Sequence, residues 1–549
     1  MKKALISVSN KENLKEIAKF LLENDYQIYS TGGTFKKLIE DFSNYENEII
    51  KISDYTGFPE ILDGRVKTLN PKIYGGILAD LSKQSHLDQL NQHQIHPISV
   101  VIVNLYPFYQ NNCIENIDIG GVSLIRASAK NYENVSILTN PKHYKKFIDN
   151  FDNLSLQIKK EWARDAFLHT TNYDNAIYNY FDETNISLKY GMNPHQSLSS
   201  VNHNGAFELI NGKLGYINVM DFIHGWLMTY EIFKLTNKTT FISMKHTSPA
   251  GLGIGTNISE DSLTVFGISD EIRDNLSAGA IAFIKSRNCD PLSSFGDFIC
   301  SSCKVDKVTA NLIKREVCDG IVAPDYEPEA LEILRSKKSG NFIVLKSNCE
   351  YFDTMHKDGW VEERKIFGMT LRQPFNSFTL NTEDIELKQY DYDAIIAYTI
   401  LKYSQSNNIS LVYNGQLLGL GCGQQNRVGC VKLAGDKSMI WRLRHHQDTI
   451  AYFLELCENK NFKRQDRVNL VYEYIEENKE KLMKSLKNLP ITLGSDGFFP
   501  FPDNIVEANK YGVTRILQPG GSIADTAVSD KCKELNIDMF SVGARMFYH

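Results

Sequence analysis

Lys245 and His246 place an ammonium group directly beside an imidazole, in the segment SMKHTSPAG. Histidine can act as a general base at neutral pH, a role that typically contributes roughly a hundred- to ten-thousand-fold in rate. The lysine could stabilise the oxyanion of a tetrahedral intermediate or protonate a leaving nitrogen. Neighbouring side chains of a strand point to opposite faces, so the pair can converge only where a strand ends. We expect that end near Pro249 and Gly251, although a surface lysine beside a structural histidine is the simpler interpretation of these residues alone.

A second group of polar residues lies in the first third of the chain. The turn Thr31-Gly32-Gly33-Thr34 could let backbone N–H groups approach a phosphate at a helix N-terminus, but a purely structural tight turn is an equal alternative. The segment Gly64-Arg65-Val66-Lys67-Thr68 combines two cations with a hydroxyl, which also fits a solvated loop. The segments Asn104-Leu105-Tyr106-Pro107 and Asp118-Ile119-Gly120-Gly121, followed by Lys130, complete the group. Together these clusters predict a site for a small anionic molecule.

Short apolar runs predict the strands that would position this second group. They cover residues 4–8, 27–30, 100–105 and 135–138, and apolar residues at helical spacing lie between them. Strands that are apolar on both faces and separated by helices predict a parallel sheet covered on both sides. Binding sites in such sheets lie at the carboxyl ends of the strands, where the polar clusters fall. We expect Ser9 or Asn10 to cap the first helix and the second helix to begin near Phe35.

The composition is that of an ordinary globular protein without a general affinity for polyanions. The chain has 549 residues, of which 42% are hydrophobic and 23% charged, with a formal net charge of -6 and a pI of about 6.1. This balance predicts no nucleic-acid or membrane partner. The N-terminal apolar run, Ala4 to Val8, is too short for a signal peptide, and no run approaches the roughly 18 apolar residues of a membrane span. Ten cysteines without a framework spacing predict reduced thiols in a cytosolic protein.

Seven segments of the first third resemble, in order, one known family. SVSNK, STGGT, TGFPE, GRVKTLNP, NLYPF, IDIGG and RASAKN are similar to the cyclohydrolase domain of the bifunctional purine-biosynthesis enzymes, which join AICAR (aminoimidazole carboxamide ribonucleotide) transformylase to IMP cyclohydrolase. The resemblance implies a methylglyoxal-synthase-like, doubly wound α/β domain that binds IMP and its precursor, FAICAR. It implies nucleotide contacts from Ser9, Asn10, Lys11, Thr31, Gly32, Gly33, Thr34, Arg65, Val66, Lys67, Thr68, Asn104, Asp118 and Ile119. It also implies catalytic roles for Lys67, Tyr106, Asp118 and Lys130.

The chemistry of ring closure agrees with these residue types. The carboxamide nitrogen attacks the formyl carbon of the same molecule, and water is then lost. Because both groups are tethered, the main requirement is a favourable conformation. A lysine and a tyrosine can polarise the formyl oxygen and carry a proton, and an aspartate can accept from the amide N–H. None of these steps requires a metal or a cofactor.

The rest of the chain carries motifs that resemble the transformylase domain of the same family. They are KYGMNPHQ, KHTSPAG, SSFGDF, GQQNRV, SDGFFPFPDN and the C-terminal RMFYH, so the resemblance covers essentially the whole chain. It implies two cytidine-deaminase-like α/β subdomains without the catalytic zinc. It implies AICAR contacts from Lys189, Tyr190, His246, Gly296, Asp319, Asn407, Arg427, Phe498 and Arg545. At the interface of a homodimer, it implies contacts to 10-formyltetrahydrofolate from Val428, Asp503, Ser522 and Ile523.

By this resemblance, the chain performs the last two steps of de novo purine synthesis. The co-substrate 10-formyltetrahydrofolate gives its formyl group to AICAR, which yields FAICAR, and FAICAR then cyclises to IMP. His246 would take the proton from the attacking amine, and Lys245 would stabilise the transition state. We expect a cyclohydrolase domain over residues 1–184 and a transformylase domain over residues 185–549, without a metal.

Three positions depart from the usual family pattern. Lys189 stands where arginine is common, and a lysine cannot form the planar bidentate contact to a phosphate. Asn10 replaces a common aspartate, and Ile523 stands where a small residue is frequent. These departures affect single ligand contacts and not the expected reactions.

Two other functions are alternatives. The CxxC motif Cys300-Ser301-Ser302-Cys303 would suit a zinc deaminase, but a structural zinc site usually needs four ligands, and the sequence has no second pair. The deaminase signature HxE is also missing, because Thr247 and Ser248 follow His246. The second alternative is a non-catalytic purine-nucleotide-binding relative. The joint presence of four candidate catalytic residues argues against it: Lys67, Lys130, Lys245 and His246.

Overall fold

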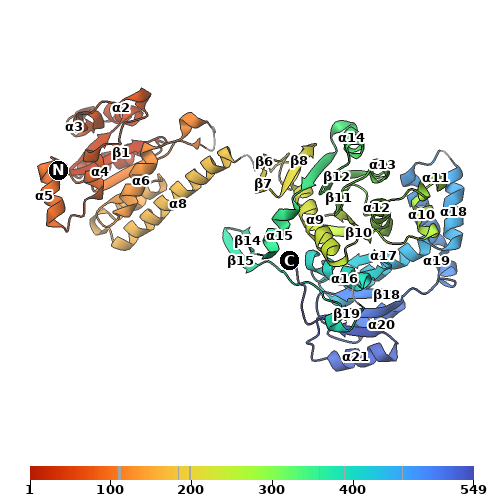
Figure 1. Cartoon of the computed structure of the whole chain (residues 1–549). Helices are drawn as coiled ribbons and strands as arrows, with labels where there is room; N and C mark the ends of the chain where they lie inside the picture. The colour runs from red at the N-terminus through yellow and green to blue at the C-terminus, as the bar shows by residue number, and fades with distance from the viewer. Residues whose placement is uncertain (109–112, 183–184, 197–198, 358, 389–390, 460) are drawn as a thin grey trace. The chain divides into compact units, whose positions relative to one another are not determined.

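The computed structural model describes residues 1–108, 113–182, 185–196, 199–357, 359–388, 391–459 and 461–549 (Figure 1). The chain forms two compact units, Met1–Glu183 and Thr184–His549. Residues 183 and 184, where the first expected domain ends, lie outside the described residues. Within the described ranges, no helix is both long and apolar enough to cross a membrane.

The first unit is built on a five-stranded sheet in the order β3-β2-β1-β4-β5. Its strands are β1 Lys2–Val8, β2 Tyr26–Ser30, β3 Ile49–Lys51, β4 Val100–Asn104 and β5 Ser136–Leu138. Every pairing is parallel, and the central strands are buried on both faces, so the predicted parallel sheet is confirmed. The sequence does not predict β3, because three residues are too few to show a pattern.

Helices connect these strands and supply much of the first unit's core. They are α1 Leu14–Glu23, α2 Gly32–Asp41, α3 Ile52–Thr56, α4 Pro71–Leu78, α5 Gln84–Gln92, α6 Gly120–Lys130, α7 Lys142–Asp149 and α8 Leu156–Phe181. Two expected helix starts are wrong. The cap of α1 is Asn13 and not Ser9 or Asn10, because both of those residues are held in a loop by Asn104. Helix α2 begins at Gly32, before Phe35, so the glycine pair forms its first turn.

The second unit is built on an 11-stranded sheet in the order β20-β19-β18-β16-β17-β10-β9-β11-β12-β13-β8. Its strands are β8 Phe207–Asn211, β9 Thr240–Lys245, β10 Ser248–Ile254, β11 Asp297–Ser301, β12 Cys318–Ala323, β13 Ile343–Ser347, β16 Ile409–Tyr413, β17 Gln416–Gly421, β18 Ile491–Ser495, β19 Val513–Gln518 and β20 Asp538–Ser541. Two small sheets pair β6 Asn185–Ser187 with β7 Ser200–Asn202, and β14 Val361–Ile366 with β15 Met369–Pro374.

The large sheet repeats one arrangement of strands. In the first half, β9 and β10 form an antiparallel hairpin, β11 lies antiparallel to β9, and β12 and β13 follow in parallel. In the second half, β16, β17, β18, β19 and β20 repeat these pairings. An antiparallel contact between β10 and β17 joins the two halves. This duplication agrees with the expected pair of α/β subdomains.

The helices of the second unit follow the same repeat. They are α9 Tyr216–Thr236, α10 Glu260–Phe266, α11 Asp270–Arg273, α12 Ala278–Cys289, α13 Lys307–Lys314, α14 Pro328–Ser336, α15 Cys349–Lys357, α16 Tyr392–Thr399, α17 Arg427–Arg444, α18 Gln447–Glu458, α19 Arg464–Met483, α20 Asp503–Lys510 and α21 Asp525–Glu534. α12 packs closely on β10, and α17 packs in the same way on β17. Gly251 and Gly419 allow these approaches, because a Cβ at either glycine would meet the backbone of the facing helix.

Candidate active sites

The carboxyl ends of β1, β2 and β4 bring the polar residues of the first unit to one edge of its sheet. Asn104 ends β4, and its Oδ1 accepts the backbone N–H groups of Ser9 and Asn10 at 2.7 and 2.8 Å. Its amide also donates to the carbonyl of Asn10 at 3.0 Å. Thr34, in the first turn of α2, accepts from the Val8 N–H at 3.1 Å. These bonds fix the loop after β1 against the start of α2, so three of the predicted segments do meet.

The side chain of Lys67 lies against two glycine turns at this edge. A Cβ on Gly32 would lie 3.5 Å from Lys67 Nζ, and one on Gly64 would lie 2.6 Å from Lys67 Cε. Both glycines have positive φ angles, 47° and 86°, so only glycine fits there without strain. The ion pair of Lys67 with Glu60 is long, at 3.9 Å. An anion at the N-terminus of α2 would therefore meet the first amides of the helix and the Lys67 ammonium.

Asp118 lies at the N-terminus of α6, on the same side of the sheet. Its Oδ1 accepts the Gly121 N–H at 2.7 Å, and its own N–H donates to the Tyr173 hydroxyl at 2.8 Å. Burial raises the pKa of the Asp118 carboxyl, although the N–H groups of Gly121 and Tyr106 and the Lys67 ammonium oppose the shift. A carboxylate with a raised pKa is well suited to exchange a proton with a bound substrate.

The remaining candidates of the first unit divide into two groups. Ile119, next to Asp118 in sequence, and Tyr106, whose N–H bonds to Asp118, are both exposed. A Cβ on Gly120 would lie 2.9 Å from the Thr68 hydroxyl, so these residues adjoin the site. Arg65 instead pairs with Glu115 at 2.5 Å on the surface, and Lys11 is exposed after Asn10. The structure does not bring Lys130 to the group. It ends α6, ten residues after Gly120, which corresponds to about 15 Å along the helix axis.

Lys245 and His246 lie at a tight hairpin turn of the second unit. Lys245 ends β9, and His246 and Thr247 form the turn with φ angles of 52° and 59°. Positive φ at both central residues matches the twist of the two flanking strands. Pro249 and Gly251 lie inside β10, so the expectation that they end the strand is wrong. The turn itself ends the strand, so the side chains of Lys245 and His246 need not point to opposite faces of the sheet.

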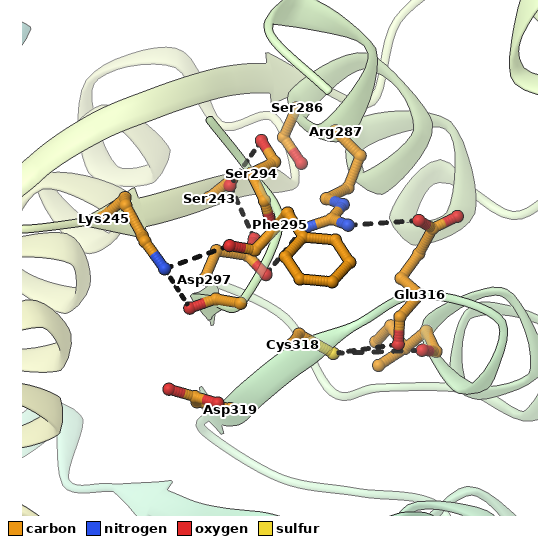
Figure 2. Close-up of polar contacts among 12 residues, drawn as sticks. Ser243, Lys245, Ser286, Arg287, Ser294, Phe295, Asp297, Glu316, Cys318 and Asp319 are labelled. Carbon is orange, nitrogen blue, oxygen red and sulfur yellow. Dashed lines mark hydrogen bonds and ion pairs between the residues drawn. The ribbon is translucent and has the colours of Figure 1, made fainter. Parts of the chain in front are cut away.

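The Lys245 ammonium is anchored by the loop that precedes β11, as Figure 2 shows. Nζ donates to the carbonyls of Phe295 and Gly296 at 3.0 and 2.9 Å. Gly296 has a φ of 73°, and a Cβ there would approach Lys245 Nζ to 3.1 Å. An ammonium has three donors, so one N–H is left for a substrate. The candidate catalytic residue Lys245 and the candidate AICAR contact Gly296 are therefore in direct contact.

A buried ionic network holds that loop from beneath (Figure 2). Arg287 of α12 pairs with Asp297 at 2.6 Å and with Glu316 at 3.1 Å, and its guanidinium also donates to the Ser294 carbonyl. The Ser243 hydroxyl, on β9, donates to Asp297 at 2.5 Å. Arg287 and Asp297 are both more than nine-tenths buried. The network thus joins β9 to the loop whose carbonyls hold Lys245.

Asp221 of α9 supports the turn on its other side. Its Oδ1 accepts the Thr247 N–H at 2.6 Å. Burial raises the pKa of Asp221, while the Thr247 N–H, His246 and Lys245 oppose the shift. Asp319, a predicted AICAR ligand, follows Cys318 at the start of β12 and pairs with Lys338 at 2.7 Å.

Arg427 and Asn407 form a second polar cluster of the second unit. Arg427 begins α17 and donates to Asn407 Oδ1 at 2.8 Å, to the Ser495 hydroxyl at 3.0 Å and to Asp496. Asp496 also accepts from the Ser406 hydroxyl at 2.6 Å. This arrangement leaves a guanidinium, a carboxamide and the N-terminus of a long helix together, which suits an anionic ligand.

Three contacts link this cluster to the region of the Lys245 hairpin. The Cys422 thiol lies 3.6 Å from the Ser248 hydroxyl of β10. The hydroxyl of Tyr548, near the C-terminus, lies 2.5 Å from Nε2 of His224 on α9, and the Tyr548 N–H donates to Ser406 at 3.1 Å. The hairpin and the Arg427 cluster are therefore adjacent parts of one unit.

The other predicted ligands of the second unit are largely exposed. Lys189 and Tyr190 lie on the surface in the loop before β7, and the Arg545 guanidinium stacks 4.4 Å from the centre of the Phe547 ring. Phe498 is 43% exposed, and Ile523 is fully exposed. Among the predicted folate contacts, Val428 is half-buried in α17, Asp503 begins α20, and Ser522 accepts the Ala524 N–H at 3.1 Å.

The CxxC cysteines do not form a metal centre in the described part of the chain. Cys300 is buried in β11, and burial raises the pKa of its thiol. Cys303 contacts the Ser301 hydroxyl at 3.4 Å. Among the described residues, no three histidine, cysteine, aspartate or glutamate side chains are grouped as metal ligands would be.

Sequence reasoning missed the residues that support the hairpin. Asp221 and Arg287 lie in helices. Only in the folded chain does Asp221 contact the turn of the hairpin, and Arg287 contact Asp297 beside the loop that holds Lys245. One signal was available, because an acidic residue within the apolar helical stretch NVMDFIHGWLM needs a buried partner. Asp496 belongs to the motif SDGFFPFPDN, but the motif does not indicate that Asp496 contacts Arg427.

Two family models and several curated proteins match this chain. The family model for the AICARFT/IMPCHase bienzyme matches residues 128–437, and that for the MGS-like domain matches residues 13–132. The bifunctional purine biosynthesis protein PurH of Prochlorococcus marinus (strain NATL2A) is 34% identical over 592 residues, with 100% of this chain and 99% of that protein covered. The proteins of the same name from Clostridium botulinum (strain Okra / Type B1) and Clostridioides difficile (strain 630) are 34% and 32% identical, with 100% of each chain covered.

Proposed function

The chain belongs to the AICARFT/IMPCHase bienzyme family, and from this membership we propose how its residues divide the two reactions. The protein carries out the last two steps of purine biosynthesis: formyl transfer to AICAR, which gives FAICAR, and cyclisation of FAICAR to IMP. We assign cyclisation to residues 1–184 and formyl transfer to residues 185–549. The observation that carries this assignment is the presence of a separate polar site in each compact unit.

For cyclisation, we propose that the nucleotide phosphate binds at the N-terminus of α2, beside Lys67. The amides of α2 and the Lys67 ammonium support this placement. Asp118 would accept a proton from the attacking carboxamide nitrogen, and Tyr106 would contact the formyl oxygen. Water leaves after the ring closes. Lys130 has no part in this proposal, because α6 separates it from Asp118.

For formyl transfer, we propose that His246 accepts the proton of the AICAR amine as the amine attacks the formyl carbon. The remaining N–H of Lys245 would stabilise the oxyanion of the tetrahedral intermediate, and then the folate nitrogen leaves with a proton. Two carbonyl groups hold the Lys245 ammonium in place. This supports the role, because the ammonium does not have to reorient during the reaction. Arg427 and Asn407 would bind the nucleotide beside the hairpin.

We propose 10-formyltetrahydrofolate as the formyl donor and a homodimer as the working form. Exposed apolar side chains at and near the predicted folate contacts support a covering partner: Ile523, a predicted contact, is fully exposed, and Phe501, two residues before the predicted contact Asp503, is 64% exposed. Sedimentation velocity on the purified chain is expected to show a dimer. A monomer that is fully active at assay concentration would contradict the proposal.

A two-substrate assay tests the proposed function. The purified chain is expected to convert AICAR plus 10-formyltetrahydrofolate into IMP, and no FAICAR should form when the folate is omitted. The alternative, a non-catalytic relative, predicts tight nucleotide binding without turnover. Metal analysis of untagged protein completes the test, since stoichiometric zinc would favour a deaminase.

Lys67→Met is expected to lower the rate of cyclisation about a hundredfold, the usual effect of removing one donor from a developing charge. Formyl transfer should be unchanged, because Lys67 belongs to the other compact unit. Each step is measured alone, with FAICAR or with AICAR plus the folate. Lys83→Met is the matched control, because that lysine is 61% exposed and outside the site. Equal losses of cyclisation rate in Lys67→Met and Lys83→Met would show that Lys67 has no specific role in the mechanism.

Lys189→Arg is expected to lower the KM for AICAR about two- to tenfold with little change in kcat. A planar guanidinium can contact a phosphate through two N–H groups, whereas an ammonium acts as a point charge. Steady-state kinetics at saturating folate measures both constants. Lys213→Arg, another exposed lysine, should leave them unchanged. An unaltered KM in Lys189→Arg would show that this position does not contact the phosphate.

A further inference from the structure

A cavity of about 240 Å³ lies beside the second hairpin of the large sheet, between β16 and β17. Its walls include Lys285 of α12, Asn414 of the hairpin, Trp441 and Arg442 at the end of α17, and Lys487 before β18. None of its lining residues belongs to the two candidate active sites. The cavity therefore requires its own explanation.

The two hairpins of the large sheet, β9–β10 and β16–β17, are built in the same way. Asn414 and Gly415 form the second turn with φ angles of 50° and 68°, as His246 and Thr247 form the first. Asp393 of α16 accepts the N–H groups of Asn414 and Gly415 at 2.9 and 2.7 Å, as Asp221 of α9 accepts that of Thr247. By the strand repeat, the cavity lies where the other half carries its candidate catalytic pair.

The second hairpin lacks the residues for the same chemistry. Tyr413 and Asn414 stand at the positions that Lys245 and His246 occupy in the first hairpin. An asparagine amide cannot act as a general base at neutral pH. The duplicated position therefore keeps a cavity without the catalytic pair, which favours binding over catalysis.

Positive charge dominates the walls of the cavity. Lys285 is buried, and its Nζ donates to the Thr256 hydroxyl at 2.7 Å and to the Asn414 carbonyl at 2.8 Å, which leaves one N–H. Burial lowers the pKa of Lys285 to about 8, so the amine is mostly protonated at neutral pH. Among the described residues, Arg442 donates to two uncharged carbonyls, those of Tyr511 at 3.1 Å and Lys487 at 2.7 Å. Asp261 supplies the carboxylate among the lining residues.

Two buried N–H groups of the lining lack an acceptor. Trp441 and Arg442 are each 6% exposed. The indole Nε1 of Trp441 and the Nε of Arg442 are buried and make no hydrogen bond within the described chain. Buried donors without an acceptor are rare in folded proteins, and each one calls for an explanation such as an absent ligand. His445, beside Trp441, supplies no charge, because burial lowers the pKa of its imidazole to about 3.

We propose that this cavity binds a small molecule that carries a phosphate or carboxylate group. Oxyanions provide several acceptors, which would satisfy the free N–H groups of Trp441, Arg442 and Lys285 and balance the charges of Arg442 and Lys285. The volume lies below the roughly 300 to 1,000 Å³ of sites for drug-sized ligands, which favours a small anion. The site is separate from both proposed reactions, and its occupancy does not depend on the assignment of His246.

Titration of the full chain with inorganic phosphate and, separately, with citrate tests this proposal. The readout is the fluorescence of Trp441, taken as the difference between the wild type and Trp441→Phe. We expect a saturable change with at least one of the anions, and the anion that binds identifies the preferred group. Because the readout is local to the cavity, phosphate bound at either nucleotide site does not contribute to it.

Lys487→Glu is the decisive variant, since Lys487 is exposed at the cavity and its replacement should not disturb folding. It is expected to weaken anion binding about tenfold or more, as the loss of a charged contact would. Lys484→Glu makes the same charge change at an exposed residue outside the lining and should bind as the wild type does. A cavity that holds only water would give no saturable signal at millimolar anion. That result, or equal affinities of the two lysine variants, would overturn the proposal.

Discussion

His246→Ala is expected to slow formyl transfer roughly a hundred- to ten-thousand-fold, the contribution of a positioned general base. His246 lies on an exposed turn beside Lys245, whose ammonium is fixed by two carbonyls. Cyclisation of FAICAR should continue at the wild-type rate, because its site lies in the other compact unit, which has its own core. The two steps are measured separately, with AICAR plus the folate and with FAICAR alone. Loss of both steps would show that the division into two sites is wrong.

His246→Asn distinguishes a lost base from a distorted turn. His246 has a φ of 52°, a conformation that alanine adopts with strain and asparagine tolerates well. Asn414 already occupies the equivalent position of the second hairpin with a φ of 50°. If His246 is the base, the asparagine and alanine variants should be equally slow. Recovery of activity in His246→Asn would assign the effect to backbone geometry.

Asp297→Ala is expected to destabilise the second unit by about 3–5 kcal/mol, the usual cost of removing one partner from a buried ionic network, and Glu316 stays as the remaining partner of Arg287. Arg287 is 5% exposed and Asp297 fully buried, so water cannot replace the lost carboxylate. Formyl transfer should also fall, because Asp297 accepts from Ser243 next to the loop that holds Lys245. Urea denaturation followed by tryptophan fluorescence measures the effect in a Trp162→Phe background, which confines the signal to the second unit.

Asp325→Ala is the matched control on the surface of the same unit. Asp325 pairs with Lys346 at 3.1 Å and Lys304 at 3.6 Å, and all three side chains are about half exposed. Such pairs contribute about 0–1 kcal/mol. The loss of unfolding free energy in Asp297→Asn should lie between those in Asp297→Ala and Asp325→Ala, because the amide keeps hydrogen bonds to the network without the charge. Equal stability of Asp297→Ala and Asp325→Ala would show that the buried network does not hold the unit together.

Local patterns in the sequence were sufficient for much of the first unit. Strands such as Val100–Asn104 are continuous apolar runs, and their order with helices between them requires a parallel sheet. The polar segments at their ends therefore had to meet at one edge. Helix starts were less predictable. Asn10 satisfies every local rule for a cap, but Asn104, 94 residues later, takes its N–H.

The second unit shows the limit of local reasoning more clearly. Order and spacing of the motifs were enough to identify the family, yet the sequence placed the strand end near Pro249 instead of at His246. The turn depends on two residues with positive φ and on Asp221, which precedes the turn by 25 residues. No periodic pattern of apolar residues records such a contact.

The order of residues is enough to identify the family, the two reactions, the parallel sheet of the first unit and the pairing of Lys245 with His246. These conclusions follow from residue identities and short spacings, which can be read without knowledge of the fold. Which charges lie together depends on the folded chain. The fold holds Lys245 against the loop next to Arg287 and Asp297, separates Lys130 from Asp118 along α6, and forms a cationic cavity at the second hairpin. The reason is physical, because electrostatic and packing contacts depend on distances in space between residues that are far apart in the chain.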